Sequence, residues 1–228
     1  LFSLIKPNML PSQSQSHQTS TNGNAAGLGV MMDLNNKGVA YLSCGRFEEA
    51  VLTLRQAVEE LQTLLRPSNS NGQSPCNMLN VSIVPCASAS HALDSPDGHF
   101  LDHNILALSS TTFKLDSSVS TAKTTTPDST PGSSSIRIEL VSAAMLYNLA
   151  FAWHARSLHT QMTATKDLKT ATNLYGMAAA AAQRCPDEEL LKGSFTKTIL
   201  MPLYNNWAHV NFQIFDQELC WKCIQDLR

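Results

Sequence analysis

The chain has 228 residues, of which 43% are hydrophobic and only 15% are charged. Its 16 basic and 18 acidic residues give a net charge of −2, which argues against binding to nucleic acid through a basic surface. No run of about 18 apolar residues occurs, so neither a transmembrane helix nor a membrane partner is expected.

The first 66 residues divide into a polar tail and a helical pair. Residues 1–28 are rich in Ser, Gln, Asn and Gly, and such a segment buries too little apolar surface to offset its ordering entropy, so it is predicted to be a disordered tail. Residues 29–66 carry apolar side chains at steps of three and four, interrupted by Gly45 and ended by Pro67. This pattern predicts two helices joined by a tight turn.

Residues 67–135 form a low-complexity segment in which one residue in three is Ser or Thr. Residues 80–84 and 105–108 have the composition of short strands, the second with a continuation over 111–115. Because an isolated pair of strands is marginally stable in water, most of this segment is predicted to be a disordered insertion that folding does not require.

Helical periodicity returns over residues 136–228. One helix is expected from Ile136 to about Thr160, and a second over 163–184. A third begins at Pro186 and reaches about Leu200, where Pro202 is expected to break or kink the path. Residues 203–215 and 217–227 then make a last helical pair.

A short motif occurs three times in the same register within these predicted helices. The three copies read Asn36-x-Gly38-x-x-Tyr41, Asn148-x-Ala150-x-x-Trp153 and Asn206-x-Ala208-x-x-Asn211. Small residues are needed where paired helices cross closely. The first copy adds further matching positions at Gly45, Ala50, Leu54 and Ala57.

On these residues the chain resembles the tetratricopeptide repeat (TPR) family. The copies lie near 31–65, 143–184 and 201–228, and the last two are degenerate; in the third, Asn211 replaces the aromatic residue and Phe215 the turn glycine. The resemblance implies an all-α fold of TPR-like antiparallel helix pairs, a short α-solenoid, carrying the long insertion.

The resemblance also implies that ligands meet the first helix of each pair on a concave inner face. The positions carried over by register as peptide-binding residues are Asn35, Val39, Leu42, Tyr147, Phe151, His154, Asn205, His209 and Phe212. None of these is Lys or Arg, whereas members of the family that hold a C-terminal carboxylate use basic residues there. The expected face is apolar, aromatic and lined by amides, which suits an amphipathic helix or an extended peptide.

Two motifs raise the possibility of other chemistry. Cys220 and Cys223 form a C-x-x-C pair, which is either a redox dithiol or a pair of small buried residues, and we favour the buried reading. Residues 97–103 hold two Asp and two His, and we expect a solvated loop there rather than a metal site. No catalytic constellation is found, and no cofactor or metal is predicted.

The sequence therefore predicts a non-catalytic scaffold that binds a protein or peptide partner. The alternative is a fragment of an enzyme, with the helical array as an accessory part or with Cys220 and Cys223 as a dithiol. The six cysteines, read as free thiols, favour a reducing cytoplasmic or nuclear compartment.

Overall fold

The computed structural model describes residues 20–66, 78–79, 81–87, 109–117, 136–160, 164–185 and 194–227. These residues are mostly helical, as predicted. The helices are α1 (Ser20–Ser43), α2 (Phe47–Leu65), α3 (Ile138–His159), α4 (Ala164–Ala182), α6 (Ser194–Gln213) and α7 (Gln217–Asp226). The strands are β1 (Met78–Leu79), β2 (Val81–Ala87), β3 (Thr111–Ser117) and β4 (Ile136–Arg137).

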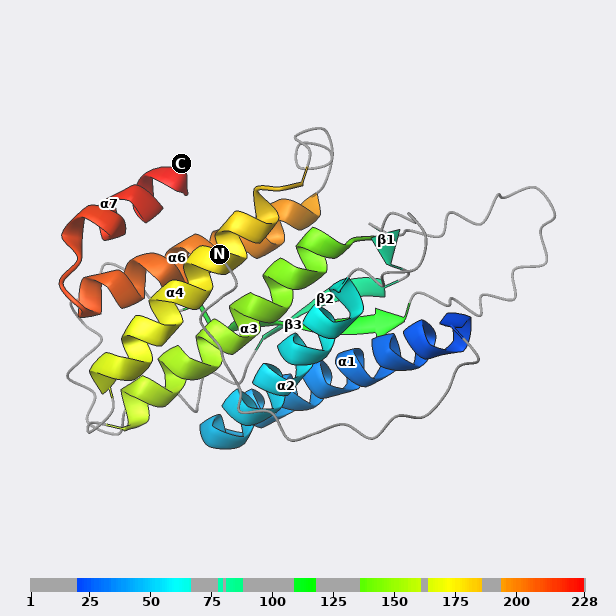
Figure 1. Cartoon of the computed structure of the whole chain (residues 1–228). Helices are drawn as coiled ribbons and strands as arrows, with labels where there is room; N and C mark the ends of the chain where they lie inside the picture. Colours follow the sequence, from blue (N-terminus) through cyan, green and yellow to red (C-terminus); the bar gives the residue numbers. More distant parts are fainter. Residues whose placement is uncertain are drawn as a thin grey trace.

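The helices form three antiparallel pairs that are stacked in chain order (Figure 1). The second helix of one pair packs against the first helix of the next, so that α2 contacts α3 and α4 contacts α6. One continuous apolar core runs through the stack. The all-α architecture of helix pairs is confirmed.

Two glycines shape the pair formed by α1 and α2, one at the turn and one where the helices cross. Gly45 has φ 70°, a left-handed conformation that glycine adopts without strain, and the next amide, Arg46 N–H, donates to Tyr41 O at 2.9 Å. Earlier in α1, Gly38 lies directly against the buried side chain of Leu54, where a Cβ atom would collide with it. The close crossing of these two helices therefore depends on a missing side chain.

The turn between α6 and α7 has the same backbone geometry without a glycine. Phe215 has φ 61°, and the following amide of Asp216 donates to Asn211 O at 2.9 Å. The alignment places Phe215 opposite Gly45 and Asn211 opposite Tyr41, and the two turns repeat one hydrogen bond at those positions. The first and third copies are thus structurally equivalent here.

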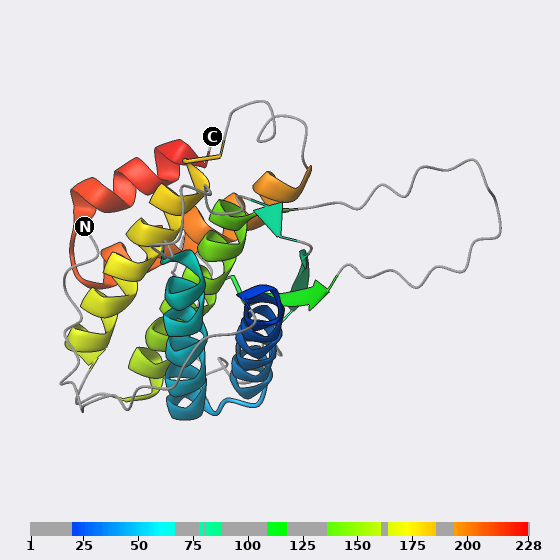
Figure 2. The ribbon, with the colours of Figure 1, turned by 45° about the vertical axis from the view of Figure 1, so that its right-hand side comes forward.

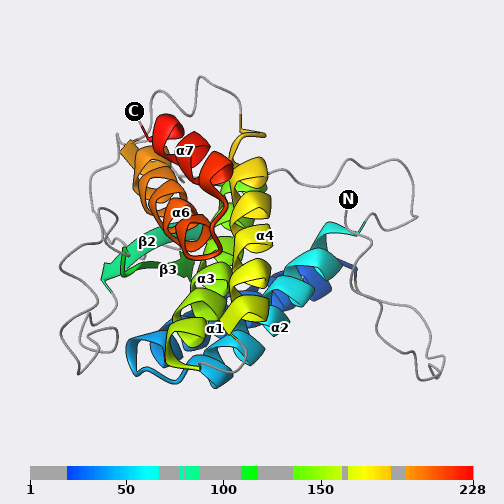
Figure 3. The same cartoon turned by 90° about the vertical axis from the view of Figure 1, so that its left-hand side faces the viewer.

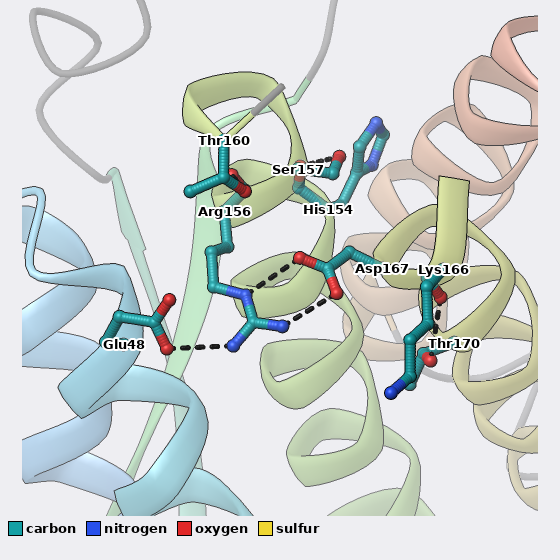
Figure 4. Close-up of polar contacts among 8 residues, drawn as sticks. All are labelled: Glu48, His154, Arg156, Ser157, Thr160, Lys166, Asp167 and Thr170. Carbon is teal, nitrogen blue, oxygen red and sulfur yellow. Dashed lines mark hydrogen bonds and ion pairs between the residues drawn. The ribbon is translucent and has the colours of Figure 1, made fainter. Parts of the chain in front are cut away.

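An ion-pair network joins the middle of the stack. In Figure 4, Arg156 of α3 reaches Asp167 of α4 on one side and Glu48 of α2 on the other. The guanidinium contacts Asp167 through two hydrogen bonds, of 2.9 and 2.7 Å, and Glu48 through one of 2.8 Å. It also lies over the Trp153 ring, 4.0 Å from the centroid. Three helices from two pairs are therefore held by one side chain.

The antiparallel strands β2 and β3 lie beside the first helices of the pairs, away from α2 and α4 (Figures 2 and 3). Val81, Ile83, Phe113 and Leu115 are buried and belong to the same core as the helices. The short strands β1 and β4 form a second antiparallel pair just before α3. Strands β2 and β3 correspond to the strands expected at 80–84 and 111–115, whereas residues 80 and 105–108 lie outside the described part of the chain.

The structure adds one contact to the expectations and corrects two of them. The described strands of the 67–135 segment pack into the core, a contact that the sequence does not predict, while the dispensability of this segment for folding stays a prediction. Helix α1 begins at Ser20 rather than near residue 29, because its early turns still contact α2 where Gly27 meets Leu64. Finally, α6 continues through Pro202 as one helix, held by the buried side chains of Ile199 and Leu203 on either side.

Candidate functional site

Three asparagines, one from the first helix of each pair, hold the backbone of the strand segment. Asn36, Asn148 and Asn206 are called the asparagine ladder below. Each side-chain amide accepts from the backbone N–H and donates to the backbone C=O of a single residue. The paired residues, with the N–H and C=O distances in that order, are Leu115 with Asn36 (2.8 and 2.7 Å), Phe113 with Asn148 (2.9 and 2.7 Å) and Ser109 with Asn206 (2.7 and 3.0 Å).

The chemistry of the primary amide explains why asparagine occupies these positions. It carries a donor and an acceptor side by side, as a backbone peptide group does. In an extended strand, the N–H and C=O of one residue point in the same direction, toward the neighbouring strand. The ladder therefore supplies from three helices the hydrogen bonds that another β-strand would supply.

Strand β2 satisfies the opposite edge of β3. The register pairs Cys86 with Thr112 and Val84 with Lys114, whose backbone groups alternate with those held by the ladder. Phe113 lies opposite Pro85 as a non-hydrogen-bonded pair, because the N–H and C=O of Phe113 point to the other edge, where both bond to Asn148. Both edges of β3 are thus occupied, one by a strand and the other by side chains.

Two further side chains complete the contact with β3. The Tyr147 hydroxyl donates to Thr111 O at 2.8 Å and accepts from Asn206 at 2.9 Å. Burial raises the pKa of Tyr147 well above its ordinary value, so the hydroxyl stays protonated and able to donate. Asn35 donates to Phe113 O at 3.0 Å and accepts from Asn148 at 3.0 Å.

The side chains of β3 are sorted between the core and the outside. Phe113 and Leu115 are 0% and 1% exposed, whereas Lys114 and Asp116 are exposed. The Phe113 ring meets the edge of the Tyr147 ring at a centroid distance of 5.2 Å. The site thus contacts an aromatic and an aliphatic side chain two residues apart.

A buried histidine pair lies further along the same helices. His154 Nε2 is 3.1 Å from His209 Nδ1 and 3.2 Å from Gln213 Oε1, and His154 Nδ1 is 3.4 Å from the Tyr175 hydroxyl. Burial, with His209 nearby, lowers the pKa of His154 to about 3, and burial lowers the pKa of His209 to about 4. Both rings are therefore neutral at pH 7 and serve as hydrogen-bonding groups.

The nine residues predicted to bind a peptide have different positions in the structure. Asn35 and Tyr147 form hydrogen bonds to β3. Phe212 is 58% exposed and Asn205 is half-buried, donating to Asn206 at 3.3 Å. The remaining five are buried in the helical core and are Val39, Leu42, Phe151, His154 and His209. No free partner is needed to explain the burial, since helices and β3 cover this face.

The sequence already contained the signal for the ladder, although its role was missed. Asn36, Asn148 and Asn206 mark the repeat register, and the register alone does not indicate that their amides bind a strand. An amide in the same position of three successive first helices places three equivalent donor–acceptor pairs along one face of the stack. The strand that these asparagines hold could not be found in the same way, because the residues that they bond lie 35 to 97 positions away in the sequence.

The two cysteines of the C-x-x-C pair lie in surroundings that keep their thiols protonated. Cys220 and Cys223 are buried one turn apart on α7. Burial, together with nearby acidic groups, raises the pKa of both thiols, that of Cys223 to about 12. Redox dithiols need the opposite shift, toward the thiolate.

In the residues that the structure describes, no helix is long and apolar enough to cross a membrane, and no three His, Cys, Asp or Glu side chains group as metal ligands. The segment 97–103, with its two Asp and two His, lies outside those residues. No family model, curated protein or solved structure matches the chain.

Proposed function

We propose that the chain is a non-catalytic protein-interaction scaffold of the TPR type, which binds an extended peptide on the face formed by α1, α3 and α6. The single observation that carries this proposal is the asparagine ladder. Each of its amides takes both hydrogen-bonding groups of one extended residue, as a strand would. A bound helix has no such free groups in its interior, so an extended ligand fits this face better than a helical one.

The repeat register supports the TPR assignment. The first and third copies share the turn geometry at Gly45 and Phe215. In all three copies, the asparagine at the same position of the repeat bonds the backbone of the strand segment. Because the ladder and Tyr147 contact backbone atoms, they accept many sequences. Since no side chain that touches β3 through these bonds is charged, binding should depend little on salt.

A synthetic peptide of residues 109–117 tests the proposal. The protein partner is the full chain carrying Phe113→Ala and Leu115→Ala, which weaken the internal strand while leaving the ladder intact. Excess peptide should bind and raise the melting temperature, because a ligand that binds only the folded state stabilises it by mass action. If the double variant is unfolded alone, the peptide should restore helical circular dichroism.

A matched pair of variants completes the experiment. Adding Asn148→Asp to the same chain should weaken peptide binding at least tenfold, since a carboxylate cannot donate to the carbonyl that Asn148 contacts. Asn173→Asp, the same change at an exposed position of α4, should leave binding unchanged. Absence of any peptide binding or thermal shift would contradict the proposed function.

A further inference from the structure

We propose that β3 is an internal occupant of the partner site, and that the partner is a protein segment that takes its place by presenting an aromatic and an aliphatic residue two positions apart. This inference rests on the proposed function and adds to it both the chemistry of the partner and the regulation of the site.

The backbone contacts define which segments fit. A partner in the place of β3 must offer an N–H and a C=O at the positions of Ser109, Phe113 and Leu115, because the ladder uses both groups there. At the position of Thr111, Tyr147 uses only the carbonyl. Proline or an N-methylated residue is therefore excluded at the positions of Ser109, Phe113 and Leu115 and is tolerated at the position of Thr111.

The side-chain contacts add a sequence preference. Phe113 and Leu115 are almost fully buried, whereas Lys114 between them is exposed. Burial of two apolar side chains supplies most of the favourable free energy that such a strand can gain here. The expected partner motif is aromatic, any residue, aliphatic, within an extended segment.

Displacement fits the structure better than addition of a strand to the outer edge of β2. Val84 and Cys86 direct their backbone groups toward β3, so the residues that alternate with them face the outer edge of β2. Pro85 is one of these outer-edge residues. Proline removes a donor from the middle of that edge, which is how natural sheets discourage further strands. An incoming strand that replaces β3 gains the ladder as well as the inner edge of β2.

Internal occupancy makes the site self-regulating. Only the fraction of molecules in which β3 has left the ladder can bind, so the apparent affinity for a partner is reduced by that fraction. A change in β3 itself that weakens its contacts, as at Phe113 or Leu115, should therefore strengthen binding in trans, although it removes favourable contacts from the chain itself.

The test measures the 109–117 peptide by fluorescence anisotropy against the full wild-type chain and against the full Phe113→Ala/Leu115→Ala chain. The double variant should bind at least tenfold more tightly than wild type. Against the double variant, a peptide with N-methyl-Phe at the position of Phe113 should lose at least tenfold in affinity, and so should a peptide with Ala there. A peptide N-methylated at the position of Thr111 should bind as the parent does.

The outcomes separate this inference from the proposed function. Equal affinity for the two chains would show that the peptide binds without displacing β3, which overturns the inference and leaves peptide binding intact. Equal binding of the N-methyl-Phe, Ala and parent peptides would overturn the contact pattern. Failure of every peptide to bind either chain would overturn the proposed function itself.

Discussion

At the scale of single residues, Asn148 is the buried centre of the ladder. It forms hydrogen bonds with both backbone groups of Phe113 and with Asn35. Asn148→Asp should lower the free energy of unfolding by about 2–4 kcal/mol, since two acceptors lose their donor and a buried carboxylate faces them. Urea unfolding measures the change. The exposed Asn173→Asp should be nearly neutral, and an equal loss in both variants would contradict the assigned role.

Arg156 is a second residue whose loss should be costly. Its guanidinium faces Asp167, which is 1% exposed, and also bonds to Glu48. Arg156→Met should destabilise the fold by about 3 kcal/mol, because it takes a two-point charged partner away from the buried carboxylate of Asp167. Thermal and urea unfolding of the variant check this value.

The control for Arg156 is an exposed pair. Arg46 and Glu49 lie 2.8 Å apart on the surface, with about half of each side chain exposed to solvent. Arg46→Met should change stability far less, since solvent screens such pairs. Similar losses for the two arginines would show that Asp167 does not depend on Arg156.

At the scale of the elements, the α6–α7 turn carries strain that the α1–α2 turn does not. Phe215 is 88% exposed and has φ 61°, where Gly45 has φ 70°. Relief of the left-handed strain by Phe215→Gly is worth about 1–2 kcal/mol, and the greater freedom of the unfolded chain costs about 0.4–1 kcal/mol. The variant should be more stable by up to about 1 kcal/mol in urea unfolding. A loss of stability would mean that the Phe215 ring makes a needed contact.

Two glycines of α1 should respond in opposite directions to alanine. Alanine favours a helix over glycine by about 1 kcal/mol. At Gly29 nothing lies within 4 Å of the added Cβ, so Gly29→Ala should raise the melting temperature. At Gly38 the added Cβ meets the buried Leu54, and overpacking of about 1–3 kcal/mol should exceed the gain. If Gly38→Ala also raised the melting temperature, the close crossing of α1 and α2 would be wrong.

The helices could be predicted from the sequence because their information is local. The steps of three and four between Phe47 and Leu61, followed by Pro67, define α2 within a few residues. Helix α6 was divided in the prediction because a proline in isolation argues for a break, and only the packing of Ile199 and Leu203 shows why the helix continues.

The strand site could be predicted only in part. The alternation in 111–115 indicates a strand, and the three asparagines indicate a repeat, but nothing local connects the two. Ser109 and Asn206 are 97 residues apart, and their pairing depends on the stacking of all three helix pairs. Tyr147 was expected on the inner face from the register, whereas its hydrogen bond to Thr111 required the fold.

At the scale of the whole molecule, stability should fall as the pH drops below about 6.5. His154 and His209 have folded-state pKa values lowered to about 3 and 4, while an unfolded histidine titrates near 6.5. Between these values the unfolded chain binds more protons than the folded chain does. The stabilisation is therefore complete above about pH 6.5 and is lost as the pH falls toward 4, by up to about 1.4 kcal/mol per pH unit for each histidine.

Urea unfolding at pH 7, 6 and 5 measures this dependence. In a His209→Gln chain, the unfolding free energy should fall less steeply between pH 6 and 5, because one histidine fewer takes up a proton on unfolding. This difference in slope does not depend on the absolute stability of the variant. His159→Gln, the same change at an exposed position, serves as the comparison. An unchanged slope in the His209→Gln chain would contradict the neutral buried pair.

The ladder also divides the amide protons of β3 into two sets. Those of Phe113 and Leu115 are held by the ladder, as is the Ser109 N–H just before the strand, whereas those of Thr112 and Lys114 face β2. Deuterium exchange followed residue by residue should therefore respond to Asn148→Asp with a period of two. Phe113 N–H should exchange faster, while the neighbouring protons of Thr112 and Lys114 stay slow for as long as β2 remains in place. An ordinary three-stranded sheet could not be altered in this way, because no single side chain there controls one proton of a strand.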